Sequence, residues 1–367
     1  MKRIKVDIPF LVSIFILVIG GYLIFSSASL GLLSSQTVKY GNVAFSQVFF
    51  GLFLGGIACI ITSKIDYKIY RRYAFYIYIL SFLATLLVFV PHLGVGHGGA
   101  QRWIYIGQFS LQPSELLKMG FVLYFAAWLA GVKNKTKTFT YGFLPLLILT
   151  AITGAVLLKQ PDTDTFFIIC FAGVAMFLSA GGRWRYIFIL AIIGVVGLGI
   201  IAHERPYVMS RIKTFINPSD NSLGSGYQIQ QSLIAIGSGG FSGRGFGQSI
   251  QKFNYLPEPI GDSIFAVAGE EFGFVGAAVI VLIFIFFAFR GLKIAGRVAD
   301  PFGGLVVVGI VIMIVSQAFV NIGAMVGVLP LSGIPLPFVS QGGTALFMAL
   351  LEVGIVLNIS KSANKKI

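Results

Sequence analysis

Runs of about 20 mostly apolar residues recur ten times along this chain and limit its fold more than any other feature. An α-helix needs about 20 such residues to cross a bilayer. Only 11% of the 367 residues are charged, whereas an ordinary soluble domain has roughly 25%. A soluble enzyme, a disordered chain and a disulfide-stapled module are therefore excluded. We predict an all-α polytopic membrane protein, a single domain over 1–367, with ten transmembrane helices at approximately 8–27, 44–63, 73–91, 113–131, 141–158, 165–182, 186–203, 263–289, 303–327 and 342–359.

Basic residues indicate how these helices are oriented. The net charge is +14, and because the excess lies between apolar runs it points to membrane topology rather than to nucleic acid. The short connections on one side carry only Lys39, Arg102 and Lys159. Since basic loops stay in the cytoplasm, we expect cytoplasmic termini and a long outer loop, 204–262, between helices 7 and 8. The basic clusters on the cytoplasmic side are at 2–5, 64–72, 133–137, 183–185, 290–297 and 361–366.

Ionisable residues within the predicted spans are candidates for function, because a charge at membrane depth costs at least a few kcal/mol unless it is paired or hydrated. Glu115 and Lys118 are three residues apart and share a helix face, which predicts an ion pair that serves either function or helix packing alone. Glu352 stands alone in the last span, where a structural polar contact is the simpler interpretation. Glu270 and Glu271 are adjacent, so their side chains point about 100° apart and cannot both face one pocket.

Asp262 lies where the long outer loop meets the eighth span. Two prolines, Pro257 and Pro259, and Gly261 stiffen the approach to it. An acid in the first helical turn is a good N-cap, and capping is the simpler interpretation of the local sequence. A carboxylate at the boundary between water and membrane is also where a general base would meet a substrate with a lipid tail and a polar head. Both interpretations are open from these residues alone.

The outer loop contains a predicted short helix followed by a glycine-rich stretch. Ile229, Leu233 and Ile236 recur at helical spacing, which favours an interfacial or re-entrant helix. Residues 237–247 form either a flexible loop or, with Arg244, a cradle of N–H groups for a phosphate.

Several cations are expected on the outer side, where they would suit a diphosphate head group. Trp103, beside one of them, is typical of a membrane interface. The spacing of the histidines supports no metal site. The cations are Arg102, Lys118, Lys159, Arg244 and Lys252.

Four motifs follow one another along the chain: Gly99–Ile104 with Gln112–Lys118, then Gln160–Asp162, then a stretch from Gly226 to Gly273, and finally Gly333–Ser340. In this order they resemble the SEDS family of cell-shape, division and sporulation proteins. The segment after Phe246 is more similar to the division branch, FtsW, than to the elongation branch, RodA. The chain departs from the usual family pattern at Thr163-Asp164, at Ile260-Gly261 and at Gln341.

The resemblance implies an inverting glycosyl transfer that polymerises peptidoglycan glycan strands from lipid II at the outer face of the bacterial cytoplasmic membrane. The GlcNAc 4-hydroxyl of the acceptor lipid II attacks C1 of the growing strand's MurNAc, and undecaprenyl diphosphate leaves. The family's acid corresponds to Asp262, which the resemblance makes the catalytic base. The residues implied in substrate binding are Arg102, Trp103, Glu115, Lys118, Asp162, Gln231, Arg244 and Ser340.

The resemblance also implies partners. These are a class B penicillin-binding transpeptidase and the division or elongation machinery, and no nucleic acid is expected. A divalent cation, Mg²⁺ or Mn²⁺, could assist the diphosphate, although no ligand cluster requires one. Two other functions remain open. A lipid II flippase would explain the buried charges equally well but needs no base, and a non-catalytic division scaffold would tolerate changes at Glu115, Lys118 and Asp262.

Overall fold

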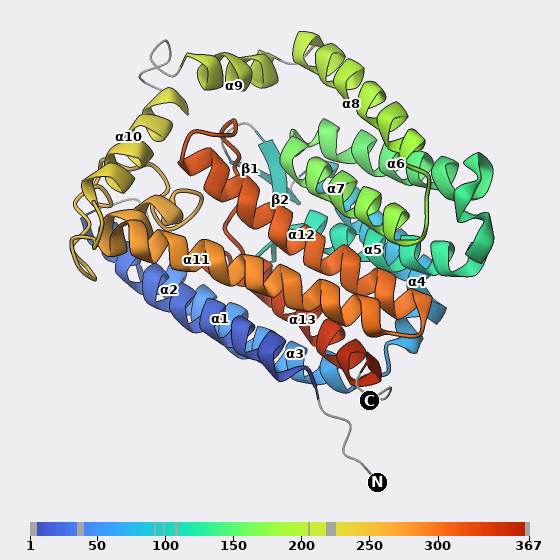
Figure 1. The fold of residues 1–367 in the computed structure, drawn as a ribbon. Helices are drawn as coiled ribbons and strands as arrows, with labels where there is room; N and C mark the ends of the chain where they lie inside the picture. Colours follow the sequence, from blue (N-terminus) through green and yellow to red (C-terminus); the bar gives the residue numbers. More distant parts are fainter. Residues whose placement is uncertain are drawn as a thin grey trace.

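The computed structural model describes residues 6–34, 40–91, 93–97, 100–106, 109–204, 206–217 and 225–363, and the chain is mostly helical (Figure 1). Within these ranges, eight helical segments are long and apolar enough to cross a membrane. Two shorter apolar helices, Thr163–Ser179 and Trp184–Gly197, fall in the sixth and seventh expected spans. The prediction of a polytopic helical membrane protein is confirmed.

In the N-terminal half, short 3-10 and π-helical turns interrupt or extend the α-helices. The second apolar region, for example, begins as an α-helix, continues as a π-helix and ends as an α-helix. The elements in order are α1 (Ile8–Ser29), η1 (Leu30–Ser34), α2 (Tyr40–Phe45), η2 (Ser46–Leu54), α3 (Gly55–Lys64), α4 (Lys68–Leu86), η3 (Leu87–Phe89), β1 (Gly94–His97), β2 (Ala100–Ile106), β3 (Phe109–Leu111), α5 (Pro113–Val132), η4 (Lys133–Lys137), η5 (Phe139–Phe143) and α6 (Leu144–Lys159).

The C-terminal half is α-helical apart from its connections. Within its described residues, the loop 204–262 contains two short helices, of which the second coincides with the short helix expected from apolar spacing. The elements are α7 (Thr163–Ser179), α8 (Trp184–Glu204), α9 (Pro206–Ile216), α10 (Ser225–Ser238), α11 (Ile264–Arg297), α12 (Pro301–Met325) and α13 (Gly343–Ala363).

Two helices begin with the same local chemistry. The Asp7 carboxylate accepts a hydrogen bond from the backbone N–H of Phe10 at the start of α1, and the Asp300 carboxylate accepts one from Gly303 at the start of α12. Each aspartate satisfies an N–H group that the first helical turn leaves unpaired. A proline follows within two residues in both cases, where its missing N–H costs nothing.

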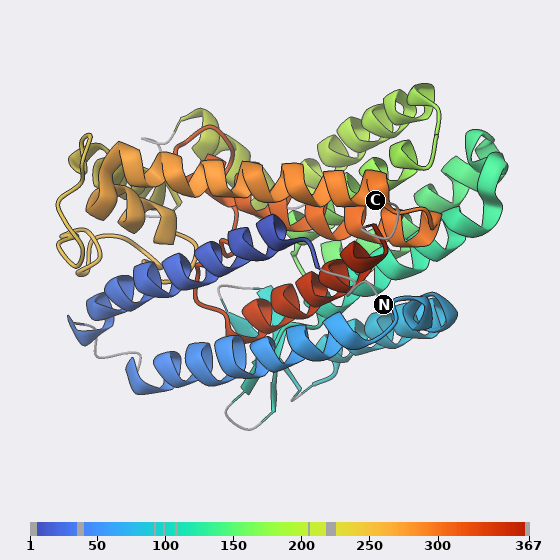
Figure 2. The same ribbon diagram turned by 60° about the horizontal axis from the view of Figure 1, so that its bottom comes forward.

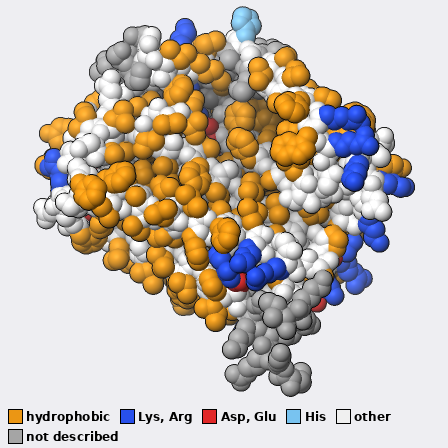
Figure 3. Space-filling model, in the orientation of Figure 1, with side chains coloured by type: hydrophobic (Ala, Val, Ile, Leu, Met, Phe, Trp, Pro, Cys, Tyr) orange, Lys and Arg blue, Asp and Glu red, His pale blue; other side chains and the backbone are white. Residues whose placement is uncertain are grey.

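Helix α12 lies at the centre of the bundle and packs against α5, α7, α11 and α13 (Figures 1 and 2). Its side chains are largely buried, whereas peripheral helices expose large apolar side chains such as Phe49, Tyr76 and Phe188. In Figure 3 hydrophobic side chains cover most of the visible face, and basic side chains gather along its right edge and lower border. Exposed apolar side chains of this kind face lipid in a membrane protein.

The start of the first helix and the end of the last helix lie side by side. The Asp7 backbone N–H donates to the Ser360 hydroxyl at 3.1 Å, and the Asp7 carboxylate forms an ion pair with Arg290 at 2.6 Å. The first residues of α1 and the last residues of α13 therefore lie at the same end of the bundle.

A small antiparallel sheet, in the order β1-β2-β3, connects α4 to α5 and was not expected in an all-α protein. Its register pairs Gly94 with Ile104 and Ile104 with Leu111. The segment lies between two apolar spans, and its strands are only three to seven residues long. A β-favouring run in β2, Trp103 to Ile106, is too short to stand out beside such spans.

Helix α11 breaks at Gly273, whose φ of 64° is readily adopted only by glycine. The break frees backbone groups at the membrane, where each must find a partner. The outer loop supplies them: the N–H groups of Arg244 and Gly245 donate to the carbonyls of Glu270 and Glu271, and Phe274 N–H donates to the Gly240 carbonyl. The glycine-rich stretch is therefore ordered against α11.

Candidate active site

A cavity of about 650 Å³ opens at the end of the bundle opposite Asp7 and Ser360. Gly31, just beyond α1, and Gly343, at the start of α13, line it, as does the chain that leads into α11. Three of the predicted site residues, Arg102, Trp103 and Asp262, also line this outer cavity. The structure thus brings together residues that lie 160 positions apart in the sequence.

The backbone around Asp262 is fixed by hydrogen bonds to three consecutive carbonyl groups. The Ile260 carbonyl accepts from the backbone N–H of Gln341 at 2.7 Å, and the Gly261 carbonyl accepts from the Ser340 hydroxyl at 2.7 Å. The carbonyl of Asp262 itself accepts from the Asn321 side-chain amide at 2.8 Å. The N-cap position of α11 is Ser263, so the capping interpretation of Asp262 does not hold and its carboxylate remains at the cavity.

Two arginines approach Asp262 around Gly333. A methyl group placed on Gly333 would lie 3.7 Å from an Asp262 carboxylate oxygen and 3.9 Å from both the Arg102 and the Arg211 guanidinium groups. Burial, reinforced by the negative charges of Glu258 and Asp164, raises the pKa of Asp262 to about 7 although both arginines oppose the shift. Near neutral pH this carboxyl can therefore both accept and release a proton.

Each arginine is held by its own aspartate. Arg102 lies 3.6 Å from the carboxylate of Asp162 and donates to the carbonyl of Pro161. Arg211 forms a 2.9 Å ion pair with Asp164. Asp162 is 1% exposed, so its charge requires the neighbouring cation. Both guanidinium groups lie near Gly333, and of the two arginines it is Arg102 that lines the cavity.

Arg211 is a site residue that the sequence reasoning missed. It lies on α9, inside a segment read only as part of the long outer loop. Apolar residues at Val208, Ile212 and Phe215 recur at helical spacing there. That signal could have revealed the helix, but not that its arginine reaches Asp164 on α7.

Comparisons with known proteins agree with this arrangement. The family model of the FtsW, RodA and SpoVE proteins, described as "Cell cycle protein", matches residues 8–365. The stage V sporulation protein E of Bacillus subtilis is 38% identical, and the alignment covers 84% of both chains. A probable peptidoglycan glycosyltransferase FtsW of Geobacter metallireducens is 40% identical, over 84% of this chain and 82% of that one.

This chain belongs to the FtsW/RodA/SpoVE family. Its fold is that of the rod shape determining protein RodA of Thermus thermophilus, with a TM-score of 0.68 at 23% identity over 98% of both chains. A chain of a peptidoglycan synthase complex gives a TM-score of 0.80 at 24% identity over 97% of both. The chain is a multi-pass bacterial membrane protein, and the names FtsW and SpoVE agree with the division-like branch expected from the sequence.

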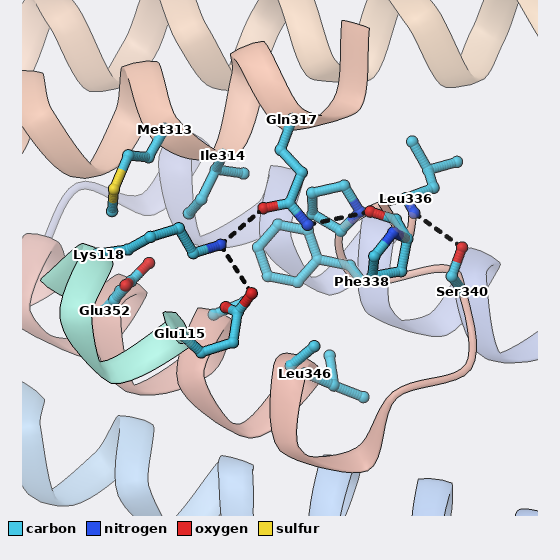
Figure 4. A pocket seen from close by; sticks show the side chains of 14 residues that line it. Glu115, Lys118, Met313, Ile314, Gln317, Leu336, Phe338, Ser340, Leu346 and Glu352 are labelled. Carbon is cyan, nitrogen blue, oxygen red and sulfur yellow. Dashed lines mark hydrogen bonds and ion pairs between the residues drawn. The ribbon is translucent and has the colours of Figure 1, made fainter. Parts of the chain in front are cut away.

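Glu115 and Lys118 form the expected ion pair, at 2.9 Å, in a second pocket that lies away from the outer cavity (Figure 4). The Lys118 ammonium also donates to the Gln317 side-chain oxygen at 2.8 Å. This Lys118 pocket has room for about one water molecule, at about 20 Å³. Neither Glu115 nor Lys118 is among the described residues that line the outer cavity. Pro335 and Ala345 line both the Lys118 pocket and the outer cavity.

Glu352, expected to make a structural polar contact, lines the same Lys118 pocket from α13 (Figure 4). It is 3% exposed, and one of its oxygens has no hydrogen-bond partner among the described residues. The pocket thus holds one ammonium group and two carboxyl groups from two helices, α5 and α13. This clustering links positions that local sequence patterns could not connect.

The remaining predicted substrate residues lie in different surroundings. Gln231 is half-buried on α10 and is not part of the cavity lining; Tyr227, one turn earlier, is. Arg244 lies 3.5 Å from Glu270, and its side chain is 37% exposed. The Ser340 hydroxyl is fully engaged, since it donates to Gly261 and accepts from the backbone N–H of Leu336 at 2.8 Å.

Glu270 and Glu271 were expected to point apart, yet both contact the loop segment 249–252. Glu270 accepts from the Ser249 hydroxyl at 2.6 Å, and Glu271 pairs with the fully buried Lys252 at 2.7 Å. Because the helix breaks at Gly273, the loop can wrap around this turn. The same loop therefore contacts two adjacent side chains that point in different directions. Lys252 is among the residues that line the outer cavity, but its ammonium is buried and pairs with Glu271.

The residues of the outer cavity do not fit a protein-held divalent cation. Among the described residues, no three or more His, Cys, Asp or Glu side chains are grouped as metal ligands. Asp162 and Asp164 are each turned toward an arginine instead.

Proposed function

We propose that this chain is a peptidoglycan glycosyltransferase that polymerises glycan strands from lipid II at the outer face of the bacterial cytoplasmic membrane, in division or shape maintenance. Its family and the names of its relatives support this activity. The observation that carries the proposal is Asp262, a carboxyl group at the outer cavity whose pKa burial raises to about 7 and which has two guanidinium groups nearby.

In the proposed reaction, Asp262 takes the proton of the GlcNAc 4-hydroxyl of the acceptor lipid II. The hydroxyl oxygen forms a bond to C1 of the growing strand's MurNAc while the bond from C1 to the diphosphate oxygen breaks. Undecaprenyl diphosphate leaves with the electron pair, and the configuration at C1 is inverted. A base with a pKa near the working pH suits this step, because it is largely ionised and still basic enough to accept the proton.

The two arginines have a second role in this proposal. The leaving diphosphate gains charge as the bond to C1 breaks, and planar guanidinium groups bind phosphate oxygens in pairs. Arg102 and Arg211 are fixed by Asp162 and Asp164, so little side-chain freedom is lost when the diphosphate binds. Trp103 lines the cavity beside Arg102 and contributes to the sugar-binding wall.

We also propose ten transmembrane helices, with both termini in the cytoplasm and the loop 204–262 outside. The contact between Asp7 and Ser360, at the end of the bundle away from the outer cavity, supports this topology, as does the asymmetry of basic residues. A reporter fused after Lys366 should lie in the cytoplasm, and one inserted at Ser222 should lie outside.

A class B penicillin-binding transpeptidase, within the division or elongation machinery, is the proposed partner. One similar structure comes from a peptidoglycan synthase complex whose title describes coordinated polymerization and crosslinking. The new strands made by this chain would be the substrate for such crosslinking.

The activity is tested with the purified protein, fluorescent lipid II and electrophoresis of the polymer. Asp262→Asn should lower the rate of polymer formation by at least about a hundredfold, the size of a typical general-base contribution. Lipid II binding should persist, because the base acts mainly in the transition state.

An Asp262→Asn protein that polymerises at the wild-type rate would remove Asp262 from the mechanism. A wild-type protein that moves lipid II across vesicles without making polymer would be a flippase. One that does neither would be a scaffold.

A further inference from the structure

Two side-chain amides on α12 hold the segment that follows this helix. Gln317 and Asn321 are four residues apart and lie on one face, one turn after the other. The Gln317 amide donates to the Pro335 carbonyl at 3.0 Å. The Asn321 amide donates to the carbonyls of Ile334 and Asp262, both at 2.8 Å.

These bonds connect the Lys118 pocket with the outer cavity. Lys118 pairs with Glu115 and donates to Gln317, which holds Pro335 (Figure 4). Asn321 holds the preceding residue, Ile334, and also the backbone of Asp262. The ion pair and the candidate base are therefore linked by hydrogen bonds that meet on two adjacent residues, Ile334 and Pro335.

Asn321 is suited to this connection by its donor group. It is completely buried, and both of its short contacts are with carbonyl oxygens, which requires that the amide nitrogen face them. Its side-chain oxygen has no hydrogen-bond partner among the described residues. A buried polar atom without a partner costs stability, so the benefit of an asparagine here lies in the two bonds that it donates.

We propose that Asn321 is a positioning residue for Asp262 and that Gln317 couples it to the Glu115–Lys118 pair. This inference rests on the proposed function, since it gives Asp262 the role of base. Asn321 bonds to the main chain of Asp262 itself, so losing the bond frees the residue from which the carboxylate projects. A displacement of about 1 Å at a reacting group can cost about a hundredfold in rate.

The test compares Asn321→Leu with Asn358→Leu. Asn358, on α13 near the opposite end of the bundle, also donates its amide to a backbone carbonyl, that of Ser63, at 2.8 Å. The matched variant therefore loses a similar interhelical bond far from the outer cavity. Asn321→Thr is a second variant, since its hydroxyl can bond to its own helix but cannot span both carbonyls.

Purified variants are assayed for polymer formation against lipid II concentration and pH. Asn321→Leu and Asn321→Thr should lower kcat by about ten- to a hundredfold while KM changes by less than about threefold. The midpoint of the pH profile should move to lower pH, because a loosened Asp262 is better hydrated. Asn358→Leu should keep both the wild-type kcat and the wild-type midpoint.

An unchanged pH midpoint in an Asn321 variant, or a kcat equal to that of Asn358→Leu, would overturn the positioning role. If Asn321→Leu does not fold, the same two criteria decide with Asn321→Thr. Asp262→Asn is assayed in parallel: if it loses activity while the Asn321 variants do not, only this inference fails. If Asp262→Asn stays active, the proposed base fails instead.

Discussion

The outer cavity and the Lys118 pocket contain the same kinds of charged side chain in opposite settings. At the outer cavity, Arg102 borders about 650 Å³ of space beside Asp262, and Arg211 approaches Asp262 near Gly333. In the Lys118 pocket, the ammonium is occupied by Glu115 and Gln317, and about 20 Å³ remains.

This difference in free space distinguishes charged side chains that can bind a ligand from charged side chains that stabilise helix packing. A buried ion pair whose groups satisfy one another has little capacity left for a substrate, and removing one member strands the other. Arg102 pairs with Asp162 and donates to the Pro161 carbonyl, yet it lines an open space, and its Nε has no hydrogen-bond partner among the described residues. This reasoning assigns ligand binding to the outer cavity and architecture to the Lys118 pocket.

The largest effect expected from this comparison is on stability. Lys118→Met should lower the free energy of unfolding by about 3–5 kcal/mol, because it leaves Glu115 as an unpaired buried charge. The double variant Glu115→Gln/Lys118→Met should recover a large part of that loss. Denaturation of the purified proteins in one detergent measures both values. Equal losses in the single and double variants would show that the pair does not behave as a closed structural unit.

A smaller effect, on activity, distinguishes two arginines of the outer side. Arg211→Ala should lower polymer formation by at least about tenfold, since removing one preorganised donor from a reaction site commonly costs about 10²–10³. Arg244→Ala is the matched control, because this arginine also pairs with a carboxylate, Glu270, but is not one of the cations that act on Asp262; it should change the rate by less than about threefold. If the two variants polymerised at the same rate, Arg211 would have no role in binding the diphosphate.

A third expected effect, which needs no substitution, is the pH dependence of the wild-type rate. Asp262 must be ionised to accept a proton, so polymer formation should fall about tenfold for each unit below pH 7 and level off above it. A rate profile measured between pH 5 and 9 checks this. A midpoint close to 4, the ordinary value for an aspartate, would mean that the carboxyl is not held in the buried, acid-rich setting described above.

The same pKa has a consequence for stability with the opposite sign to that of a typical aspartate. Because the folded-state pKa of Asp262 is raised, the folded chain binds this proton more tightly than the unfolded chain. Its contribution to stability is fully present below about pH 4 and is lost as the pH rises to about 7. Asp262→Asn should therefore gain thermal stability relative to the wild type over this range.

Some features of the site could be predicted because they follow from local spacing. Glu115 and Lys118 share a helix face by their separation alone, and Asp262 stood out as an acid at the edge of a span. Arg211 could not be assigned in this way, because its ion pair with Asp164 joins α9 to α7. Asp164 is itself a departure from the usual family pattern, so the resemblance gave no guidance about its partner.

The backbone explains other differences between expectation and structure. Helical periodicity placed Glu270 and Glu271 on different faces, but it could not reveal that α11 breaks two residues later, at Gly273, and that a loop closes over the break. The sheet β1-β2-β3 was hidden by the apolar spans on either side of it. Both features depend on which distant segment satisfies a backbone group, and local composition does not encode that choice.

The contact between the first and last helices sets the order in which the bundle can be completed. Asp7 is made first, but its partner Arg290 follows 283 residues later, and Ser360 follows later still. Until Arg290 and Ser360 are inserted, the first turn of α1 lacks these partners and is exposed to lipid headgroups and water. Closure of the bundle is thus a late event in biosynthesis, and a ribosome that stalls before α13 would leave α1 without its final neighbours.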